Sequence, residues 1–209
     1  MPQAHFRFYA ELNDFLPPRR RQIAFVHSFA ERASVKDVIE ALGAPHTEVE
    51  AILVNGAAVG FGYLVQDGDW ISVYPAFASL PLPQTMRLRP PLPAEARFVL
   101  DAHLGRLTAY LRMLGFDALY RNDFADEELA RLAQEDGRIL LTRDRGLLKR
   151  SVVTHGYCIR STQAVAQAAE VLRRFDLGAG VQPFHRCLRC NGTLQPVERS
   201  AVLGQLPPR

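Results

Sequence analysis

Prolines crowd the middle of the chain, in the stretch SLPLPQTMRLRPPLPAEAR from Ser79 to Arg97. Its five prolines cannot donate the backbone hydrogen bonds that a helix interior or a central strand requires. No helical or strand period runs through the stretch, so residues 79–96 read as an extended linker. The 209-residue chain then divides into a first domain over 1–78, a second over 97–183, and a tail over 184–209.

The first domain has the element order of a small α+β fold. FRFYAEL and IAFVHSF read as paired strands with PPRRR in the turn between them, and AILVNG and WISVYPAF read as two later strands. SVKDVIEALG between them reads as a short helix that begins after Ser34 and stops at Gly43. Two strands, a helix and two strands are the order of a β-grasp domain.

The segments VKDVIEALGAPHTEVEAILVNG and GDWISVYPAF carry a resemblance to ubiquitin-like proteins related to sulfur carriers and to the small subunit of molybdopterin synthase. Sulfur carriers act through a free Gly-Gly C-terminus. Here the last strand runs into PAFASLPLP, with no Gly-Gly at that point. The resemblance therefore implies the fold without sulfur transfer, and we expect a stabilising role or a role in docking a protein partner.

The second domain alternates strands and helices. RFVLD, DALY, RILLT and YCIR read as strands, and LGRLTAYLRMLG, DEELARLAQEDG and TQAVAQAAEVLRRF read as amphipathic helices. Such alternation predicts an α/β domain in which helices flank a parallel sheet. Ligands of these domains bind at the carboxyl ends of the strands.

Acidic residues follow three of these strands, and they are Asp101, Asp123, Asp126 and Asp144. Carboxylates gathered at one edge repel one another unless a cation neutralises them, and oxygen ligands suit Mg²⁺ or Mn²⁺. We therefore expect a metal site here, with Asp101, Asp126 and Asp144 as its catalytic ligands. Each acid has a plainer reading: Asp126 can cap its helix, Asp123 can serve a turn, and Asp144 can pair with neighbouring arginines.

Positive charge accompanies these acids. Residues 1–85 hold 6 Lys and Arg against 9 Asp and Glu, whereas residues 86–209 hold 19 against 13. This asymmetry favours a polyanionic partner for the second half, although a base-composition bias toward arginine would also produce it. Near Asp144, we expect Arg143, Arg145 and Lys149 to bind substrate phosphates.

Three longer segments, FVLDAHLGRLTAYLRMLGFDALYRND, ILLTRDRGLLKR and FHRCLRCNGTL, resemble the PIN-like ribonuclease family named after the C-terminal domain of a mutator-type exonuclease. In that family a ubiquitin-like module often precedes the nuclease domain. The resemblance implies hydrolysis of RNA, tRNA among the candidates, by an endonuclease with Mg²⁺ or Mn²⁺. It points to Asp101, Asp123 or Asp126, and Asp144 as ligands, and to Arg106 and Arg112 as phosphate contacts.

One departure from the family keeps a second function open. PIN domains usually place a further acid near the end of the fourth strand, but no Asp or Glu lies between Asp144 and Glu170 here. Ser161 and Thr162 could help hold a water there but do not replace a carboxylate. The alternative is a non-catalytic adaptor that binds RNA and docks a partner through its β-grasp module.

The tail contains CLRCNG, whose Cys187 and Cys190 have the spacing of a zinc knuckle. A tetrahedral zinc site needs four ligands, and the sequence holds no second C-x-x-C. We read residues 184–209 as a partial zinc ribbon and do not expect tight Zn²⁺ binding. No apolar run could span a bilayer and no secretory signal opens the chain, so we expect a cytoplasmic protein without a membrane partner.

Overall fold

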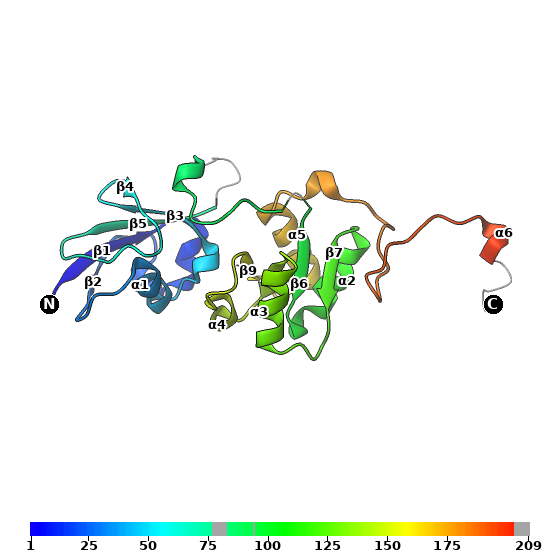
Figure 1. Cartoon of the computed structure of the whole chain (residues 1–209), viewed down its shortest axis with the longest axis horizontal. Helices are drawn as coiled ribbons and strands as arrows, with labels where there is room; N and C mark the ends of the chain where they lie inside the picture. The colour runs from blue at the N-terminus through cyan, green and yellow to red at the C-terminus, as the bar shows by residue number, and fades with distance from the viewer. Residues whose placement is uncertain (77–82, 94, 203–209) are drawn as a thin grey trace.

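The computed structural model describes residues 1–76, 83–93 and 95–202, which form two sheets joined by the proline-rich segment (Figure 1). Residues 79–82 and 94 of the predicted linker lie outside the described residues, as do 77 and 78 of the first domain and 203–209 of the tail. Within the described ranges, no helix is long and apolar enough to cross a membrane.

The first domain is a five-stranded mixed sheet with the strand order β2-β1-β5-β3-β4. The central strands β1 and β5 run parallel, and the other pairs are antiparallel. This confirms the β-grasp architecture. Its elements are β1 (Gln3–Phe8), η1 (Ala10–Phe15), η2 (Pro18–Arg20), β2 (Phe25–Ser28), α1 (Val35–Leu42), η3 (His46–Glu48), β3 (Val49–Val54), β4 (Ala57–Ala58) and β5 (Trp70–Pro75).

The ends of helix α1 show why the sequence signals were reliable. The Ser34 hydroxyl accepts a hydrogen bond from the backbone N–H of Asp37, which is the N-cap geometry. Gly43 ends the helix at φ +120°, and a Cβ there would lie 2.7 Å from the carbonyl oxygen of Phe15. By contrast, the strand predicted over FRFYAEL ends at Phe8, because Ala10 turns the chain into a 3-10 helix with φ 45°.

The second domain has four parallel strands in the order β7-β6-β8-β9, as the α/β pattern predicted. Period-2 alternation divides the buried strand residues between two faces, so Phe98 and Leu100 face α2 and α5 while Val99 faces α3 and α4. Its elements are β6 (Arg97–Leu100), η5 (Ala102–Leu104), α2 (Gly105–Met113), β7 (Asp117–Tyr120), α3 (Asp126–Glu135), β8 (Ile139–Thr142), α4 (Arg145–Leu148), β9 (Gly156–Cys158), α5 (Ala164–Arg174) and η6 (Gly178–Gly180); η4 (Gln84–Met86) precedes it in the proline-rich segment and α6 (Arg199–Val202) follows it in the tail.

The first domain covers the β9 edge of this parallel sheet. The Glu48 side chain is fully buried, and its Oε1 accepts the backbone N–H of Cys158 at 2.7 Å. Its Oε2 lies 3.4 Å from Nη2 of Arg160, and His46 Nε2 lies 3.0 Å from the carbonyl oxygen of Val153. Hydrophobic side chains of the first domain continue directly into those beneath α3 and α4. The first domain therefore covers the edge of the sheet at β9, which would otherwise be exposed.

The described part of the proline-rich segment also contacts the first domain. Gln84–Met86 form a 3-10 turn, and the backbone N–H of Leu88 donates to the carbonyl oxygen of Glu50 at 3.0 Å. The Arg89 guanidinium donates to Oε2 of Glu50 at 2.8 Å and to the carbonyl oxygen of Thr47. These contacts hold residues 87–89 against strand β3.

Candidate functional site

Two of the predicted acids meet at the carboxyl edge of the parallel sheet. Asp101 follows β6 and Asp144 follows β8, and these two strands are neighbours. The Thr142 hydroxyl, which is fully buried, donates to Oδ2 of Asp101 at 2.5 Å and accepts the backbone N–H of Asp144 at 2.9 Å. A single threonine thus fixes both acids relative to each other.

The remaining contacts of the two acids differ, and Asp144 is the more exposed of the two. Oδ1 of Asp144 accepts the backbone N–H groups of Gly146 and Leu147, so this residue caps α4. The Asp101 side chain is 14% exposed, and its Oδ1 lies 3.4 Å from Nδ1 of His103. Asp144 therefore combines the plainer capping role with a place beside Asp101.

A groove of about 410 Å³ opens next to this pair. It is lined by His103 and Arg106 from the first turn after β6, by Arg143, and by Thr162 and Gln163 from the loop after β9. Its described lining includes two guanidinium groups and no carboxylate. Both arginines are exposed, and in the described part of the chain neither has an ion-pair partner. The groove therefore offers hydrogen-bond donors to an anion beside two acids.

Asp123 and Asp126 lie after β7 at the same edge, but arginines engage them. Nε of Arg121 is 2.9 Å from Oδ1 of Asp123, and Nη2 of Arg150 is 4.0 Å from Oδ2 of Asp126. Both carboxylates are largely exposed. Over the ranges that the structure describes, no three His, Cys, Asp or Glu side chains gather in a group able to hold a metal ion. The structure thus brings Asp101 and Asp144 together and leaves Asp123 and Asp126 apart from them.

The acid after the gap, Glu170 on α5, supports the loop that follows β9. Its Oε1 accepts the backbone N–H of Arg160 at 2.9 Å and the hydroxyl of Tyr157 at 3.0 Å, and its Oε2 accepts the N–H of Ser161 at 2.9 Å. Burial raises the pKa of Glu170, but these donors outweigh it and the net pKa lies below the usual value. Glu170 therefore shapes the groove wall and does not face the groove.

Two of the predicted phosphate-binding cations turn instead toward the first domain. The Arg145 guanidinium stacks over the Phe15 ring at 5.0 Å and donates to the carbonyl oxygen of Phe15 at 3.4 Å. Nζ of Lys149 donates to the carbonyl oxygen of Glu40, at the end of α1, at 2.5 Å. In this structure both side chains therefore contact the first domain and do not line the groove.

Arg112 also differs from its predicted role as a phosphate contact. It is 5% exposed, and its guanidinium donates to the carbonyl oxygens of Ala118, Leu188 and Arg189 at 2.9–3.0 Å. These bonds tie the cysteine-containing tail to α2 and β7. Arg112 is therefore a structural residue on the side of the domain away from the groove.

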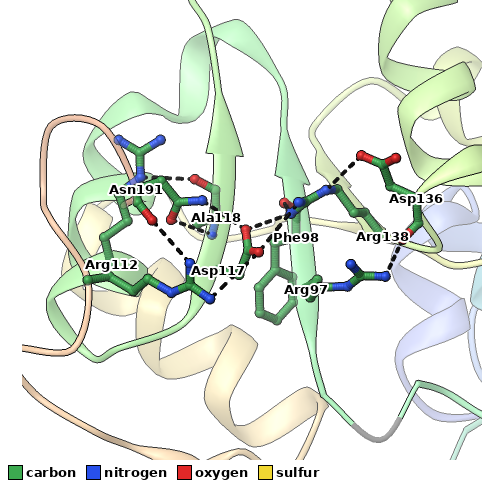
Figure 2. A network of polar contacts seen from close by, with 9 residues as sticks. Arg97, Phe98, Arg112, Asp117, Ala118, Asp136, Arg138 and Asn191 are labelled. Carbon is green, nitrogen blue, oxygen red and sulfur yellow. Dashed lines mark hydrogen bonds and ion pairs between the residues drawn. The ribbon is translucent and has the colours of Figure 1, made fainter. Parts of the chain in front are cut away.

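The tail itself is anchored by the network in Figure 2, whose centre is Asp117 at the start of β7. Arg138 Nη1 is 2.7 Å from Oδ1 of Asp117, and the Asn191 side chain donates to the same oxygen at 2.8 Å. The Asn191 amide oxygen in turn accepts the backbone N–H of Ala118 at 3.1 Å. The tail thus covers the β7 edge as Glu48 covers the β9 edge.

The cysteine turn forms, without further ligands among the described residues. Backbone hydrogen bonds from Asn191 to Cys187 and from Cys187 to Gly192 close the knuckle. Nearby backbone N–H groups lower the pKa of the Cys187 thiol. Cys187 and Cys190 are free thiols, and over the described ranges no third cysteine, histidine or acid joins them in a metal-binding group.

Sequence reasoning missed Thr142 and Gln163 as members of this site. Thr142 ends the buried strand ILLT, and its hydroxyl two positions before Asp144 is the signal that could have identified it. Gln163 lies in the loop after β9, directly after Ser161 and Thr162, which were the residues of this loop considered for holding a water.

Comparisons with known proteins agree with this two-part architecture. Residues 1–81 match the family model described as Mut7-C ubiquitin. A solved structure, the crystal structure of SAMP1 from Haloferax volcanii, aligns with 37% of this chain and 98% of its own at 20% identity and a TM-score of 0.30. The search of curated proteins gives no match to the chain. Residues 96–209 match the model described as the Mut7-C RNAse domain, and the chain therefore belongs to that family, with its ubiquitin domain in front of the nuclease domain.

Proposed function

We propose that the protein is a metal-dependent endoribonuclease whose active site is the carboxyl edge of the parallel sheet. Membership of the Mut7-C RNAse domain family supports a nuclease. The observation that carries the site assignment is the Asp101–Thr142–Asp144 unit, which lies beside a groove lined by Arg106 and Arg143.

The groove matches the chemistry of a phosphodiester chain. Each RNA linkage bears one negative charge, and arginine side chains bind phosphate oxygens through paired N–H donors. Thr162 and Gln163 add uncharged hydrogen-bonding groups to the lining that contains Arg106 and Arg143. A phosphate held by these groups would lie next to the two acids, where hydrolysis needs it.

The donor set of this site suits one divalent cation rather than two. Mg²⁺ in phosphate-processing sites is held by one or two carboxylates, with substrate phosphate and water completing the coordination. Asp101 and Asp144 meet that requirement, whereas a complete protein cage would need further ligands that the described residues do not bring together. When bound, Mg²⁺ or Mn²⁺ would neutralise phosphate charge and orient water for attack.

The chain's own residues then have distinct tasks. Thr142 holds the two acids at a fixed separation, and Arg106 and Arg143 hold the phosphate. His103 lines the groove with a side chain that is 44% exposed and contacts Asp101, so its imidazole is placed to pass a proton to the leaving oxygen.

The test is cleavage of a mixed RNA pool that includes tRNA, with Mg²⁺, with Mn²⁺ and with EDTA. Asp101→Asn and Asp144→Asn should each abolish metal-dependent products. Asparagine keeps the capping of α4 and the hydrogen bond from Thr142, so loss of activity would reflect loss of charge. The matched control is Asp136→Asn, at the opposite edge of the sheet, which should cleave normally.

A non-catalytic RNA-binding adaptor is the second candidate, and one observation favours it: among the described residues no group of three or more possible metal ligands forms beside the groove. An adaptor would bind the same RNA with equal affinity in Mg²⁺ and in EDTA and would release no products. Its ubiquitin-like domain would then dock a protein partner. Wild-type cleavage that disappears in Asp144→Asn would exclude this reading.

A further inference from the structure

One aromatic ring of the first domain contacts both of the chain segments that lead into the groove. The side chain of Phe15, at the end of η1, is 5% exposed. The guanidinium carbon of Arg145 and that of Arg160 each lie 5.0 Å from the centre of its ring. Both arginines belong to the nuclease domain, so a single side chain of the ubiquitin-like domain joins two separate segments of its neighbour.

The two arginines are close in sequence to residues of the proposed active site. Arg145 directly follows Asp144 and is two residues after Arg143, which lines the groove. Arg160 is two residues before Thr162, which lines the same groove from the loop after β9. A displacement of either arginine would therefore reach a groove residue across a single intervening position.

The first domain also supplies acceptors for the charges of these two arginines. The carbonyl oxygen of Phe15 accepts Nη1 of Arg145 at 3.4 Å. Nε of Arg160 lies 3.2 Å from Oδ2 of Asp14, and its Nη2 lies 3.4 Å from Oε2 of the buried Glu48. Two guanidinium groups near one ring carry like charge and repel each other, and these acceptors offset that repulsion.

Helix α4, which begins directly after Asp144, has little stability of its own. It contains only the four residues Arg145–Leu148, and isolated helices shorter than about 12 residues are marginal in water. Its buried side chains, Leu147 and Leu148, belong to the same hydrophobic cluster as Phe15. The turn at Asp144 is therefore stabilised by packing in which the first domain takes part.

We propose that the ubiquitin-like domain is an integral part of the nuclease site and that Phe15 is the positioning residue through which it acts. This inference rests on the proposed ribonuclease function. Undocking of the first domain would release two parts of the groove at once, the turn that carries Asp144 and the loop that carries Thr162. The partner of the ubiquitin-like domain is then the nuclease domain of the same chain, and RNA is cleaved in the docked arrangement.

The test variant is Phe15→Leu in the full chain. Leucine keeps a buried apolar side chain and the backbone carbonyl that Arg145 contacts, but it removes the ring. A small displacement of reacting groups lowers a rate steeply, so we expect single-turnover cleavage to slow by about tenfold or more.

Amide hydrogen exchange, followed by NMR on the same protein, reports on the groove without depending on activity. The reporters are the N–H groups of Gly146 and Leu147, whose acceptor is Asp144, and the N–H of Ser161, whose acceptor is Glu170. Local opening speeds the exchange of such groups, so Phe15→Leu should accelerate all three by about tenfold or more.

A matched control comes from Phe25 of β2, whose ring lies 4.8 Å from the guanidinium carbon of Arg20 within the first domain. Phe25→Leu removes the same kind of contact away from the groove. It should lower the stability of the first domain and leave both the three reporter groups and the cleavage rate of the folded protein unchanged.

Asp14→Asn is a milder second test, because the Asp14 side chain is 55% exposed and its replacement does not disturb a buried core. It removes one acceptor of Arg160, so exchange should accelerate several-fold at Ser161 and stay unchanged at Gly146 and Leu147.

The two readouts separate this inference from the proposed function. Cleavage by the wild type, together with unchanged exchange in Phe15→Leu and Asp14→Asn, would overturn the inference and keep the nuclease. Faster exchange in both variants of a protein that cleaves no RNA would refute the proposed function and leave Phe15 as the residue that holds the groove.

Discussion

Replacing Thr142 by valine removes the single hydroxyl that contacts both acids of the site. Valine keeps the shape of threonine at the end of β8, but it has no hydroxyl to donate to Asp101 or to accept the N–H of Asp144. The position is fully buried, so water cannot easily take the place of the hydroxyl. The substitution therefore disconnects the two acids without changing either of them.

The expected loss of stability follows from those two bonds. A hydrogen bond to a charged group contributes about 1.5–3 kcal/mol, and a buried N–H left without a partner costs about 1–3 kcal/mol. The added methyl group returns roughly 0.8 kcal/mol of hydrophobic stabilisation. We therefore expect Thr142→Val to lower the free energy of unfolding by about 2–5 kcal/mol, against a typical domain stability of about 5–15 kcal/mol.

The substitution should also slow cleavage by the protein that remains folded. A misplacement of about 1 Å in a reacting group can lower a rate about a hundredfold, so we expect the cleavage rate to fall by about 10- to 100-fold. Urea unfolding and single-turnover cleavage measure the two effects separately. Thr142→Ser should restore most of the activity, because it restores the hydroxyl.

A matched control comes from Thr108 on α2, which is equally buried but donates only to the carbonyl oxygen of Leu104, at 3.1 Å. Thr108→Val should lower stability slightly and leave the cleavage rate of the folded enzyme intact. If Thr142→Val cleaves at the wild-type rate, the hydroxyl does not position the acids and the reasoning fails.

Three further changes test other parts of the structure. Arg143→Ala should weaken RNA binding and reduce the slope of log affinity against log salt by about one, measured by fluorescence anisotropy; an unchanged slope would exclude a phosphate contact. Asp117→Ala removes the carboxylate that lies 2.7 Å from Arg138 and leaves this arginine, whose side chain is 11% exposed, its 3.3 Å contact with Asp136, so urea unfolding should show a loss of about 1.5–3 kcal/mol, and a loss below about 1 kcal/mol would contradict the network. The pKa of Glu170 lies below its usual 4.5 because backbone N–H groups outweigh burial. Its carboxylate therefore stabilises the fold above about pH 4.5, and that contribution is lost as the pH falls through the lowered pKa. Glu170→Gln should flatten this acid limb in unfolding titrations, and an unaltered limb would assign it to other carboxylates.

Local signals in the sequence predicted most of the secondary structure. The cap at Ser34, the stop at Gly43 and the alternation in the second half depend on neighbours along the chain, and the structure reproduces them. The first predicted strand ended earlier than expected, because Ala10 has φ 45°. An alanine does not normally indicate a positive φ, so the sequence did not predict this turn. Strand ends also placed Asp101 and Asp144 at one edge, because parallel strands present their carboxyl ends together.

The site was harder to predict because it depends on contacts distant in sequence. Arg112 is a residue type that commonly binds phosphate, but its guanidinium donates to carbonyl oxygens about 76 residues further along the chain. Asp126 follows a strand as a ligand should, but Arg150 lies 4.0 Å away from it. The sequence pattern predicts at which edge of the sheet a side chain lies. It does not predict which distant residues contact that side chain in the fold.

The charge asymmetry between the two halves of the chain is also changed by contacts between residues that are distant in sequence. Excess negative charge in residues 1–85 and excess positive charge in residues 86–209 looked like a signal for a polyanionic partner. In the structure, part of this positive charge is neutralised by acids of the first domain, since Arg160 contacts Asp14 and the buried Glu48. Lys149 likewise reaches the end of α1. The cations left for a substrate are fewer than the net charge implies, and Arg106 and Arg143 are the ones that line a groove beside the paired acids. RNA affinity should therefore depend on these two arginines far more than on the overall charge of the domain.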